Sequence, residues 1–331
     1  MINPKVKLSE KIFEKDIEQQ TTRQGYGEGL VEAGEKDEKV VVLCADLTES
    51  TKSHLFKAKF PERFIEVGVA EQGMATIASG MANYGKIPFI SSYAAFSPGR
   101  NWEQIRTTIA LNDVPVKIAG AHTGVSVGPD GATHQMLEDI ALMRSMPNMI
   151  VIYPADAIEA KKATVAAAAN GKPTYLRFAR ENTPVFTTEE TPFEIGKAEI
   201  FWESKSPQAS IIAAGPLLYE ALLAAKELEK SEIEVEVIDC HTIKPIDERI
   251  IISSAKKTGA VVTIEEAQIM GGLGGAVAEL LSRNLPTPQE FIGMPDHFGE
   301  SGQPDELLAK YHMKAKDIVT AVKKVILRKN S

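Results

Sequence analysis

The sequence of 331 residues has only two cysteines, Cys44 and Cys240, and 6% aromatic residues. Each cysteine ends an apolar run, so we expect both to be reduced, buried residues of a cytoplasmic protein. No apolar run approaches the roughly 18 residues needed to span a bilayer. The charged start MINPKVKLSEKIFEKD also lacks the apolar stretch of a signal peptide. We therefore expect neither a membrane protein nor a disulfide-stapled secreted one.

Clustered positive charge is missing as well. The formal net charge is -8, and no group of Lys and Arg offsets it. Nucleic acid and anionic membranes are therefore not expected partners. The hydrophobic content of 44% and charged content of 25% are ordinary for a globular protein, and the length suggests about two domains.

Short apolar segments alternate with segments of helical period along most of the chain. Strands are predicted at 40–45, 87–93, 115–121, 148–154, 174–179, 209–214, 233–240, 260–266 and 288–294. Helices are predicted at 71–84, 97–111, 155–170 and 315–328, the second of them opening at Ser97-Pro98. This alternation is typical of an α/β fold with parallel sheets covered on both faces.

The stretch 181–197 interrupts this rhythm with prolines and several threonines, as expected of a linker. We therefore predict two doubly wound α/β domains, covering residues 1–190 and 191–331. In open α/β sheets, ligands bind outside the carboxyl ends of the strands. The residues at these ends are Asp46, Tyr93, Phe96, His122 and Arg180, and their positions predict one shared site.

Three motifs follow one another between residues 64 and 156: GVAEQ, SYAAF and HTGVSVGPDGATHQ. Together, in this order and spacing, this region resembles the pyrimidine-binding domain of transketolase. The resemblance runs from about Thr22 to the end of the chain and covers the family's middle and last domains. It implies thiamine diphosphate as cofactor. The implied reaction moves a two-carbon ketol unit from a ketose phosphate to an aldose phosphate, in the pentose phosphate pathway.

The family's first domain has no counterpart here. In transketolases that domain carries a Gly-Asp-Gly motif that binds diphosphate and Mg²⁺ or Ca²⁺, and the one similar tripeptide, 129–131, lies within the third motif. No metal site is therefore expected in this chain. The resemblance implies a separate N-terminal transketolase subunit as partner, and a heterotetramer with two copies of each half in which this chain also self-associates.

The resemblance assigns cofactor contacts residue by residue. Glu71 matches the glutamate that shares a proton with a pyrimidine nitrogen, although alone it would also suit the first turn of a helix. Tyr93 and Phe96 match the aromatic walls of the pyrimidine pocket, with ordinary core aromatics as the alternative. Gly99 stands where the family has a third aromatic. Asp46 matches a residue lining the site near the subunit contact, or is a turn residue.

Substrate contacts are implied in the same way. His122, Asp130 and His134 match residues that bind substrate hydroxyls, and the two histidines match groups that move protons. The spacing of eight and then four residues on a glycine-rich loop fits no familiar zinc motif, and a purely structural loop is the other alternative. Arg180 matches a phosphate-binding arginine. Arg23 and Ser50 match further phosphate contacts, with a surface charge as the alternative for Arg23.

Two further features have simpler interpretations. The glycine-rich segment 265–279 could bind an anion at a helix N-terminus, but we expect close backbone packing. The remaining histidines are expected to be structural or surface residues: His54, His241, His297 and His312.

Three other functions stay open. One is a deoxyxylulose-phosphate synthase, which normally is one long chain with an acidic residue at the position of His122. Another is the beta subunit of a 2-oxo-acid dehydrogenase, which has the same domain order but lacks the third motif. The last is a non-catalytic scaffold subunit, against which the retained Glu71, histidines and Arg180 argue.

Overall fold

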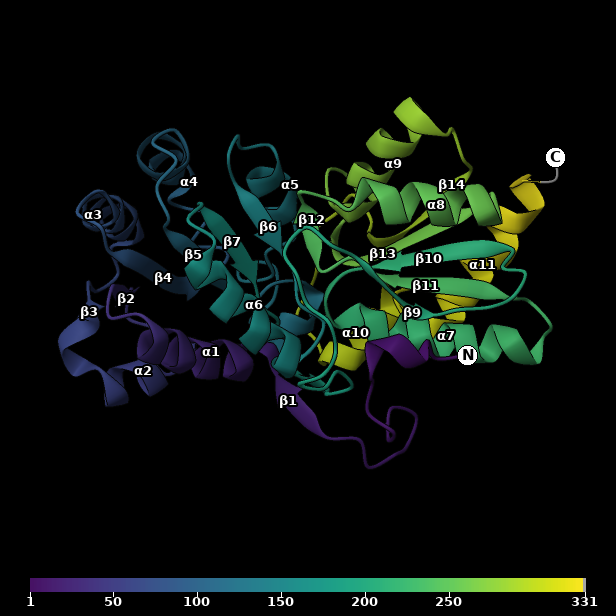
Figure 1. Ribbon diagram of the computed structural model, residues 1–331, viewed down its shortest axis with the longest axis horizontal. Coiled ribbons are helices and arrows are strands. Elements are labelled where there is room, and N and C mark those ends of the chain that lie inside the picture. The colour runs from purple at the N-terminus through teal and green to yellow at the C-terminus, as the bar shows by residue number, and fades with distance from the viewer. Residues whose placement is uncertain (330–331) are drawn as a thin grey trace.

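The structure is a computed structural model that describes residues 1–329. Two α/β halves lie side by side, one built around a seven-stranded sheet and the other around a five-stranded sheet (Figure 1). The N-terminus lies on the second half, next to α7 (Leu218–Lys230). Among the described residues, no helix is long and apolar enough to cross a membrane.

The first sheet is parallel except at one edge, where β12 pairs antiparallel with β6. In spatial order its strands are β12 (Thr242–Lys244), β6 (Ile150–Ile152), β7 (Thr174–Arg177), β5 (Lys117–Ala121), β4 (Ile87–Tyr93), β2 (Val40–Cys44) and β3 (Phe64–Glu66). Strands such as VVVLC are apolar throughout because helices cover both faces of the sheet.

One face of this sheet is covered by α1 (Thr22–Lys36) and α6 (Ala157–Ala169), with α2 (His54–Lys59) beside α1. The two long helices approach closely at Gly25, where a Cβ atom would lie 1.8 Å from the carbonyl oxygen of Ala157. The opposite face carries α3 (Glu71–Asn83), α4 (Trp102–Gln104), the π-helix η3 (Ile105–Ala110) and α5 (Asp139–Arg144).

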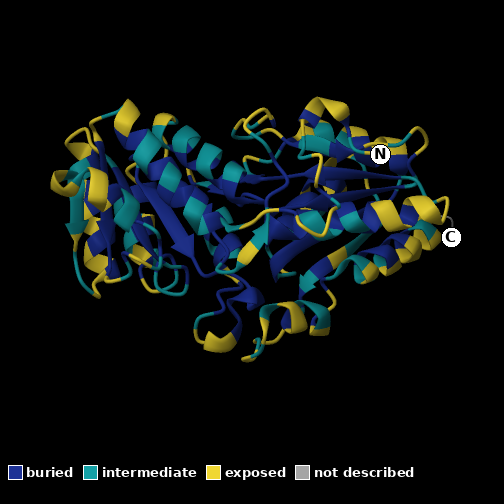
Figure 2. Cartoon of the chain, turned by 90° about the horizontal axis from the view of Figure 1, so that it is seen from below, coloured by how far each residue is buried: buried dark blue, intermediate teal, exposed yellow. Residues whose placement is uncertain are grey.

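The second sheet has the order β14 (Gln289–Met294), β13 (Val261–Gln268), β10 (Ala209–Ala213), β11 (Val235–Asp239) and β9 (Glu199–Trp202). Only β9 is antiparallel to its neighbour. Helices α7 and α11 (Ala315–Lys329) cover one face, and α8 (Glu248–Thr258) and α9 (Leu273–Asn284) cover the other. The central strands β10, β11 and β13 are buried, while exposed residues lie on the outer faces of the helices (Figure 2).

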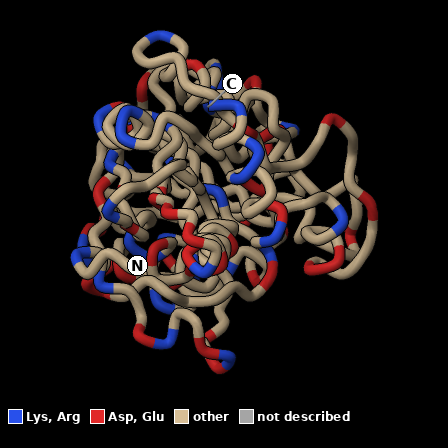
Figure 3. Tube along the Cα trace, turned by 90° about the vertical axis from the view of Figure 1, so that its right-hand side faces the viewer, with Lys and Arg blue, Asp and Glu red and all other residues tan. Residues whose placement is uncertain are grey.

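Short elements complete the described chain. They are β1 (Gln19–Thr21), β8 (Asn182–Pro184), α10 (Pro304–Lys310), and the 3₁₀ turns η1 (Pro4–Val6), η2 (Pro61–Arg63), η4 (Val125–Asp130) and η5 (Gly215–Leu217). Figure 3 shows Lys and Arg interspersed with Asp and Glu on the side of the second half. This mixed surface agrees with the absence of a basic cluster from the sequence.

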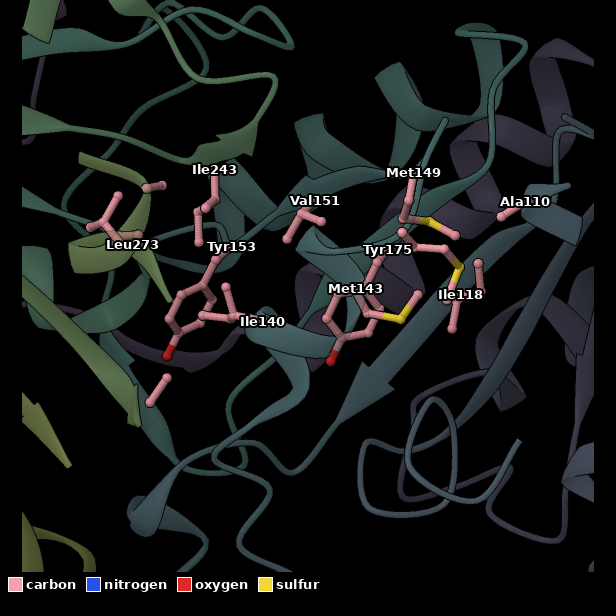
Figure 4. Close-up of a cluster of buried hydrophobic side chains, with 14 of the residues drawn as sticks. Ala110, Ile118, Ile140, Met143, Met149, Val151, Tyr153, Tyr175, Ile243 and Leu273 are labelled. Atoms are coloured by element: carbon pink, nitrogen blue, oxygen red, sulfur yellow. The ribbon is translucent and has the colours of Figure 1, made fainter. Parts of the chain in front are cut away.

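One of the hydrophobic clusters contains residues of both halves. Ile140 and Tyr153 of the first half lie close to Ile243 and Leu273 of the second (Figure 4). The chain also crosses between the halves, because β12 joins the first sheet and the amide of Asn3 donates to the carbonyl of Phe201 on β9 at 2.9 Å. The predicted boundary near residue 190 stays a prediction.

The predicted α/β class with parallel sheets is confirmed, and each predicted strand overlaps an observed one. The helix predicted from Ser97-Pro98 begins later, at Trp102. The prediction of its start was wrong because residues 93–100 form successive turns, in which the amides of Phe96 and Ser97 both donate to the carbonyl of Tyr93. Both cysteines are free and buried.

The segment 181–197 is tied to the first half rather than free. Its first residues form β8, which pairs antiparallel with β1. The carboxylate of Asp156 then accepts hydrogen bonds from the backbone amides of Phe186 and Thr187 at 2.9 and 2.6 Å. Proline and threonine content alone did not reveal these partners, which lie far away in the sequence.

Candidate active site

Four aromatic and imidazole rings meet where β4 and β5 end. Tyr93 is the last residue of β4, and its register partner Ala121 is followed by His122. The Tyr93 and His122 rings stack with centroids 3.7 Å apart. Phe96 stacks beside Tyr93 at 5.9 Å, and His134 meets Phe96 edge-on at 5.6 Å. The structure thus brings together four of the residues that the sequence singled out.

His122 sits in a dry and positively charged environment. Its side chain leaves the sheet at a left-handed backbone position, φ 57°, and the residue is 3% exposed. Burial, reinforced by the charges of Arg23 and Arg180, lowers the pKa of His122 to about 2. Its Nδ1 is buried without a hydrogen-bond partner among the described residues. A neutral imidazole can accept at one nitrogen and donate from the other, which suits a hydroxyl group.

This environment predicts a pH dependence of stability. The pKa of about 2 in the folded state lies below the ordinary value of about 6.5, so only the unfolded chain binds the extra proton between these values. Stability should therefore decline as the pH falls below about 6.5. We expect the NMR signals of the His122 ring to stay constant from about pH 8 to about pH 5.

The His122 signals are identified by their absence from the spectrum of the variant His122→Asn, which is also the control for the stability measurement. This variant should lose less stability than the unmodified chain over the same pH range, measured by urea unfolding. Part of the loss should remain, because burial also lowers the pKa of His241, to about 3. Titration of the His122 ring signal near the ordinary histidine pKa would contradict the assignment of His122 as neutral.

Two guanidinium groups lie beside His122. Arg23, from the first turn of α1, donates through Nη1 to the carbonyl of Ser50 and through Nη2 to the carbonyl of Arg180 at 2.5 Å. Its Nε is buried without a hydrogen-bond partner in the part of the chain that the structure describes. Arg180, just past β7, donates to the carbonyl of Val127 at 2.8 Å and to Glu181 at 2.9 Å. Two neighbouring cations, one with an unpaired donor, form a suitable environment for an anion.

Glu71 begins α3 and is 2% exposed. Its Oε2 accepts a hydrogen bond from Nη1 of Arg100 at 3.0 Å, and its carbonyl accepts one from Nδ2 of Asn101 at 3.0 Å. The Arg100 guanidinium also lies 5.0 Å above the Phe96 ring. Arg100 therefore connects the buried carboxylate to the ring cluster, and its side chain is 49% exposed.

The remaining predicted residues lie around this centre. Asp46 follows β2 at φ 57° and is exposed, and its amide donates to Oε1 of Glu66 at 2.7 Å. The same oxygen accepts from the amide of Gly68 at 3.0 Å, which holds the Asp46 turn close to the loop before α3. Asp130 is exposed at the end of η4, and within residues 1–329 its side chain forms no hydrogen bond or ion pair with the rings. Ser50 takes part through its carbonyl only.

The glycine-rich loop after His122 is shaped by the second half. At Gly124, φ 80°, a Cβ atom would lie 2.2 Å from Oε1 of Glu266, and the same oxygen accepts from the amide of Ser126 at 2.6 Å. Gln135 donates to the carbonyl of Glu300 at 2.9 Å. Position 99 also needs a glycine for a steric reason, because a Cβ atom there would lie 2.1 Å from the carbonyl oxygen of Ala95. No aromatic side chain fits at that position.

The glycine-rich segment 265–279 is built for packing, as expected. The carboxylate of Glu265 accepts from the amides of Leu273 and Gly274 at 2.7 and 2.8 Å, at the N-terminus of α9. A Cβ atom on Gly272 would lie 2.1 Å from this carboxylate. The chain's own glutamate therefore occupies the position that an external anion would take.

Sequence reasoning missed several residues of this site. Arg100, Asn101, Glu66 and Glu266 each contact a predicted residue or its loop, but none was singled out. Arg100 stands four residues after Phe96 in the same turn, which was a usable signal. Glu266 is 140 residues away from Ser126, and nothing local connects the two.

Comparison with known proteins agrees with this geometry. Residues 18–185 match the family model of the transketolase pyrimidine binding domain, and residues 196–318 match that of the transketolase C-terminal domain. A chain of Methanocaldococcus jannaschii with the provisional name transketolase C-terminal section is 46% identical over 91% of this chain and 94% of that one. The 6-deoxy-6-sulfo-D-fructose transketolase subunit of a Clostridium species is 40% identical over 96% and 98%.

A solved structure has the same fold over nearly its whole length. It is described as a split gene transketolase in the form of an inactive beta4 tetramer. Its sequence is 44% identical, the TM-score is 0.87, and the match covers 93% of this chain and 99% of that one. The chain belongs to the transketolase family and corresponds to the pyrimidine-binding and C-terminal domains that form the C-terminal section of a split transketolase.

Proposed function

We propose that this chain is one subunit of a thiamine diphosphate-dependent transketolase that is active only with a separate N-terminal subunit. The reaction is transfer of a two-carbon ketol unit from a ketose phosphate to an aldose phosphate. The observation that carries the proposal is the connected group formed by the buried Glu71, Arg100 and the rings of Phe96, Tyr93 and His122. A proton-holding carboxylate, flat walls and a neutral imidazole are what this chemistry requires of the protein.

The Glu71 end of this group fits the pyrimidine of the cofactor. When bound, thiamine diphosphate supplies the carbon that takes up the ketol unit. Glu71 would hold a proton at a ring nitrogen, and burial supports this because proton sharing needs a site with little water. Oε2 of Glu71 is paired with a half-exposed arginine, and its other oxygen accepts no hydrogen bond from the described residues. Phe96 offers a face for the ring, and Asp46 would line the same side.

The His122 end fits a sugar with an anionic terminus. The neutral His122 would exchange hydrogen bonds with substrate hydroxyls, and His134 and Asp130 on the same loop would bind others. His134, which also contacts Phe96, would move a proton between the sugar and solvent. Arg180, Arg23 and the Ser50 loop would hold the terminal phosphate, since two neighbouring guanidinium groups favour a dianion.

The need for a partner is supported by what lies around Glu71. Apolar side chains are exposed at Val69 (71%), Ile77 (47%) and Tyr84 (92%), on α3 and at its two ends. Gly73 and Gly80 on the same helix have nothing within 4 Å of a Cβ position. An exposed apolar face beside a buried carboxylate favours a subunit contact. The partner would hold the diphosphate and Mg²⁺, and the beta4 form of the related structure is described as inactive.

Mixing the two subunits tests the proposal. Neither the purified chain nor the co-purifying N-terminal subunit should convert xylulose 5-phosphate and ribose 5-phosphate alone. Their mixture with thiamine diphosphate and Mg²⁺ should do so, measured as release of glyceraldehyde 3-phosphate. Full activity of this chain by itself would refute the split enzyme. A mixture that assembles and binds thiamine diphosphate but shows no turnover with any donor would favour the scaffold function.

The name of one relative points to a second candidate donor substrate. The Clostridium subunit is named for 6-deoxy-6-sulfo-D-fructose, whose sulfonate is an anion like the phosphate of the pentose donor. The Arg23 and Arg180 pair could hold either group. Offering the mixture both donors at equal concentration distinguishes them, because the preferred donor should have the higher kcat/KM.

A further inference from the structure

Three buried side chains converge where the two halves meet, away from the rings described above. Glu159 lies in the first turn of α6, Asp239 ends β11, and His241 stands between β11 and β12. One potential ligand atom of each residue lies within 4.8 Å of the other two. Their exposed fractions are 1%, 0% and 0%. The group therefore connects a helix of the first half to a strand end of the second (Figure 1).

Each side chain is anchored or confined, with a ligand atom left unpaired. Oε2 of Glu159 accepts from the amide of Ala155 at 2.6 Å, while Oε1 is buried and receives no N–H or O–H hydrogen bond within residues 1–329. Nδ1 of His241 is 2.9 Å from the hydroxyl of Thr242, and the ring stacks on Phe193. Its Nε2 is buried and has no hydrogen-bond partner among the same residues. Neither carboxylate oxygen of Asp239 accepts a hydrogen bond from an N–H or hydroxyl group of the described residues, and the Asp239 carboxyl lies within hydrogen-bonding reach of the Glu159 carboxyl.

A neighbouring carboxylate shows how unusual this is. Asp156 is as buried as Asp239, yet its oxygens accept from the amides of Glu159, Phe186 and Thr187 and from the Thr187 hydroxyl. Buried acceptors are normally satisfied in this way. Two buried carboxyl groups and an imidazole with four acceptor atoms therefore need either a cation or a proton shared between the two carboxyl groups.

No described cation of the chain fills this role. Lys162 is close enough to influence Glu159 electrostatically, but its ammonium group donates to the carbonyls of Thr188 and Thr191 at 2.6 and 2.7 Å. Across residues 1–329, no Lys or Arg forms an ion pair with Glu159 or Asp239. The partner must come from outside the chain or be a proton.

We propose that Glu159, Asp239 and His241 bind a divalent transition-metal ion, with Zn²⁺ as the ion that fits best. Carboxylate oxygen and imidazole nitrogen are both good zinc ligands, and a structural zinc site takes four of them. Glu159, His241 and a bidentate Asp239 provide four atoms without a water. The Thr242 hydroxyl on Nδ1 would orient the imidazole so that Nε2 faces the ion. The ion would be structural, and independent of the Mg²⁺ expected with the diphosphate.

The sequence gives no hint of this site. Glu159 and Asp239 are 80 residues apart, and no spacing typical of zinc ligands joins them to His241. We expected no metal in this chain and interpreted His241 as a structural or surface residue. Only the meeting of α6 with the end of β11 puts the three together.

The metal content of the chain alone tests the proposal. The full chain is unfolded, stripped with chelator, refolded with or without Zn²⁺, dialysed against a weak chelator and measured by plasma mass spectrometry. We expect about one zinc per chain after refolding with Zn²⁺ and a higher melting temperature than without it. Refolding with Co²⁺ should give the visible absorption of a four-coordinate site. None of these three measurements involves the partner subunit or turnover.

Single variants locate the ion. Asp239→Asn and Glu159→Gln keep the side-chain shape but remove a charge, and each should weaken zinc binding by at least about 100-fold. Glu236→Gln is the matched control, because Glu236 is also a buried carboxylate on β11 but is paired with Lys257 and Ser254. It should keep its zinc. If Asp239→Asn does not fold, the metal content and cobalt spectrum of the unmodified chain still show whether the chain binds the ion.

A different outcome would overturn the site. If the carboxyl groups of Glu159 and Asp239 instead share a proton, zinc should remain below about 0.1 per chain. Refolding with Zn²⁺ would then leave the melting temperature unchanged. Zinc that persists equally in both cluster variants would place the ion elsewhere on the chain, which also contradicts the proposal.

Discussion

The variant Glu71→Gln is expected to lower turnover of the assembled enzyme by about 10²–10⁴-fold. Glutamine has nearly the same shape, so α3 and its contact with Asn101 should persist. It cannot give or take the proton that the carboxyl group is proposed to exchange with the cofactor. The measurement is the steady-state rate of the two-subunit mixture with saturating thiamine diphosphate, Mg²⁺ and both sugars.

A control variant and two measurements on Glu71→Gln itself separate the loss of proton transfer from loss of structure. Glu103→Gln is the matched control, since Glu103 is an exposed glutamate on the neighbouring helix α4 and should retain normal turnover. The melting temperature and the assembly of Glu71→Gln with the partner subunit should both be close to those of the unmodified chain. Near-normal turnover of Glu71→Gln would show that another group handles the proton.

Asp139→Ala is expected to have the largest effect on stability, a loss of about 3–5 kcal/mol in the free energy of unfolding. Asp139 and Arg177 are both fully buried, and Nε of Arg177 donates to Oδ2 of Asp139 at 2.7 Å. The hydroxyl of Tyr175 donates to the same oxygen at 2.6 Å. Removing the carboxylate leaves a guanidinium charge without its counter-ion in the core. Urea unfolding followed by circular dichroism measures the loss.

The exposed pair Lys172–Asp113 provides the control for Asp139→Ala. Its side chains are 51% and 38% exposed, and Asp113→Ala should change the free energy of unfolding by no more than about 1 kcal/mol. Replacing both buried partners, with Asp139→Leu and Arg177→Met, should recover much of the loss because no unpaired charge remains. Equal losses from Asp139→Ala and Asp113→Ala would contradict a special role for the buried pair.

Much of the fold could be predicted from local pattern. Strands such as β2 and β6 are apolar runs, and α3 and α11 have clear helical periods. The three-residue edge strands β3 and β12 were missed, because their pairing depends on neighbours rather than on their own residues. The same holds for β8, whose partner β1 is distant in the sequence.

The candidate site could likewise be predicted only in part. Strand ends predicted the positions of Tyr93, His122 and Arg180, because parallel strands end at one edge of the sheet. The role of Glu71 came from the resemblance to transketolase and remains a proposal. The neutral state of His122 depends on burial and on the charges of Arg23 and Arg180, which lie far apart in the sequence, so no linear pattern encodes it. The metal cluster depends on contact between the halves and was missed for the same reason.

The exchange of segments between the halves has a mechanical consequence. Residues 1–6 pack on the second sheet, while β12 from the second half completes the first. Neither half could therefore swing away as a rigid lid without breaking strand pairing or core contacts. Admission of the proposed sugar substrate must then be left to flexible loops or to the movement of whole subunits past one another.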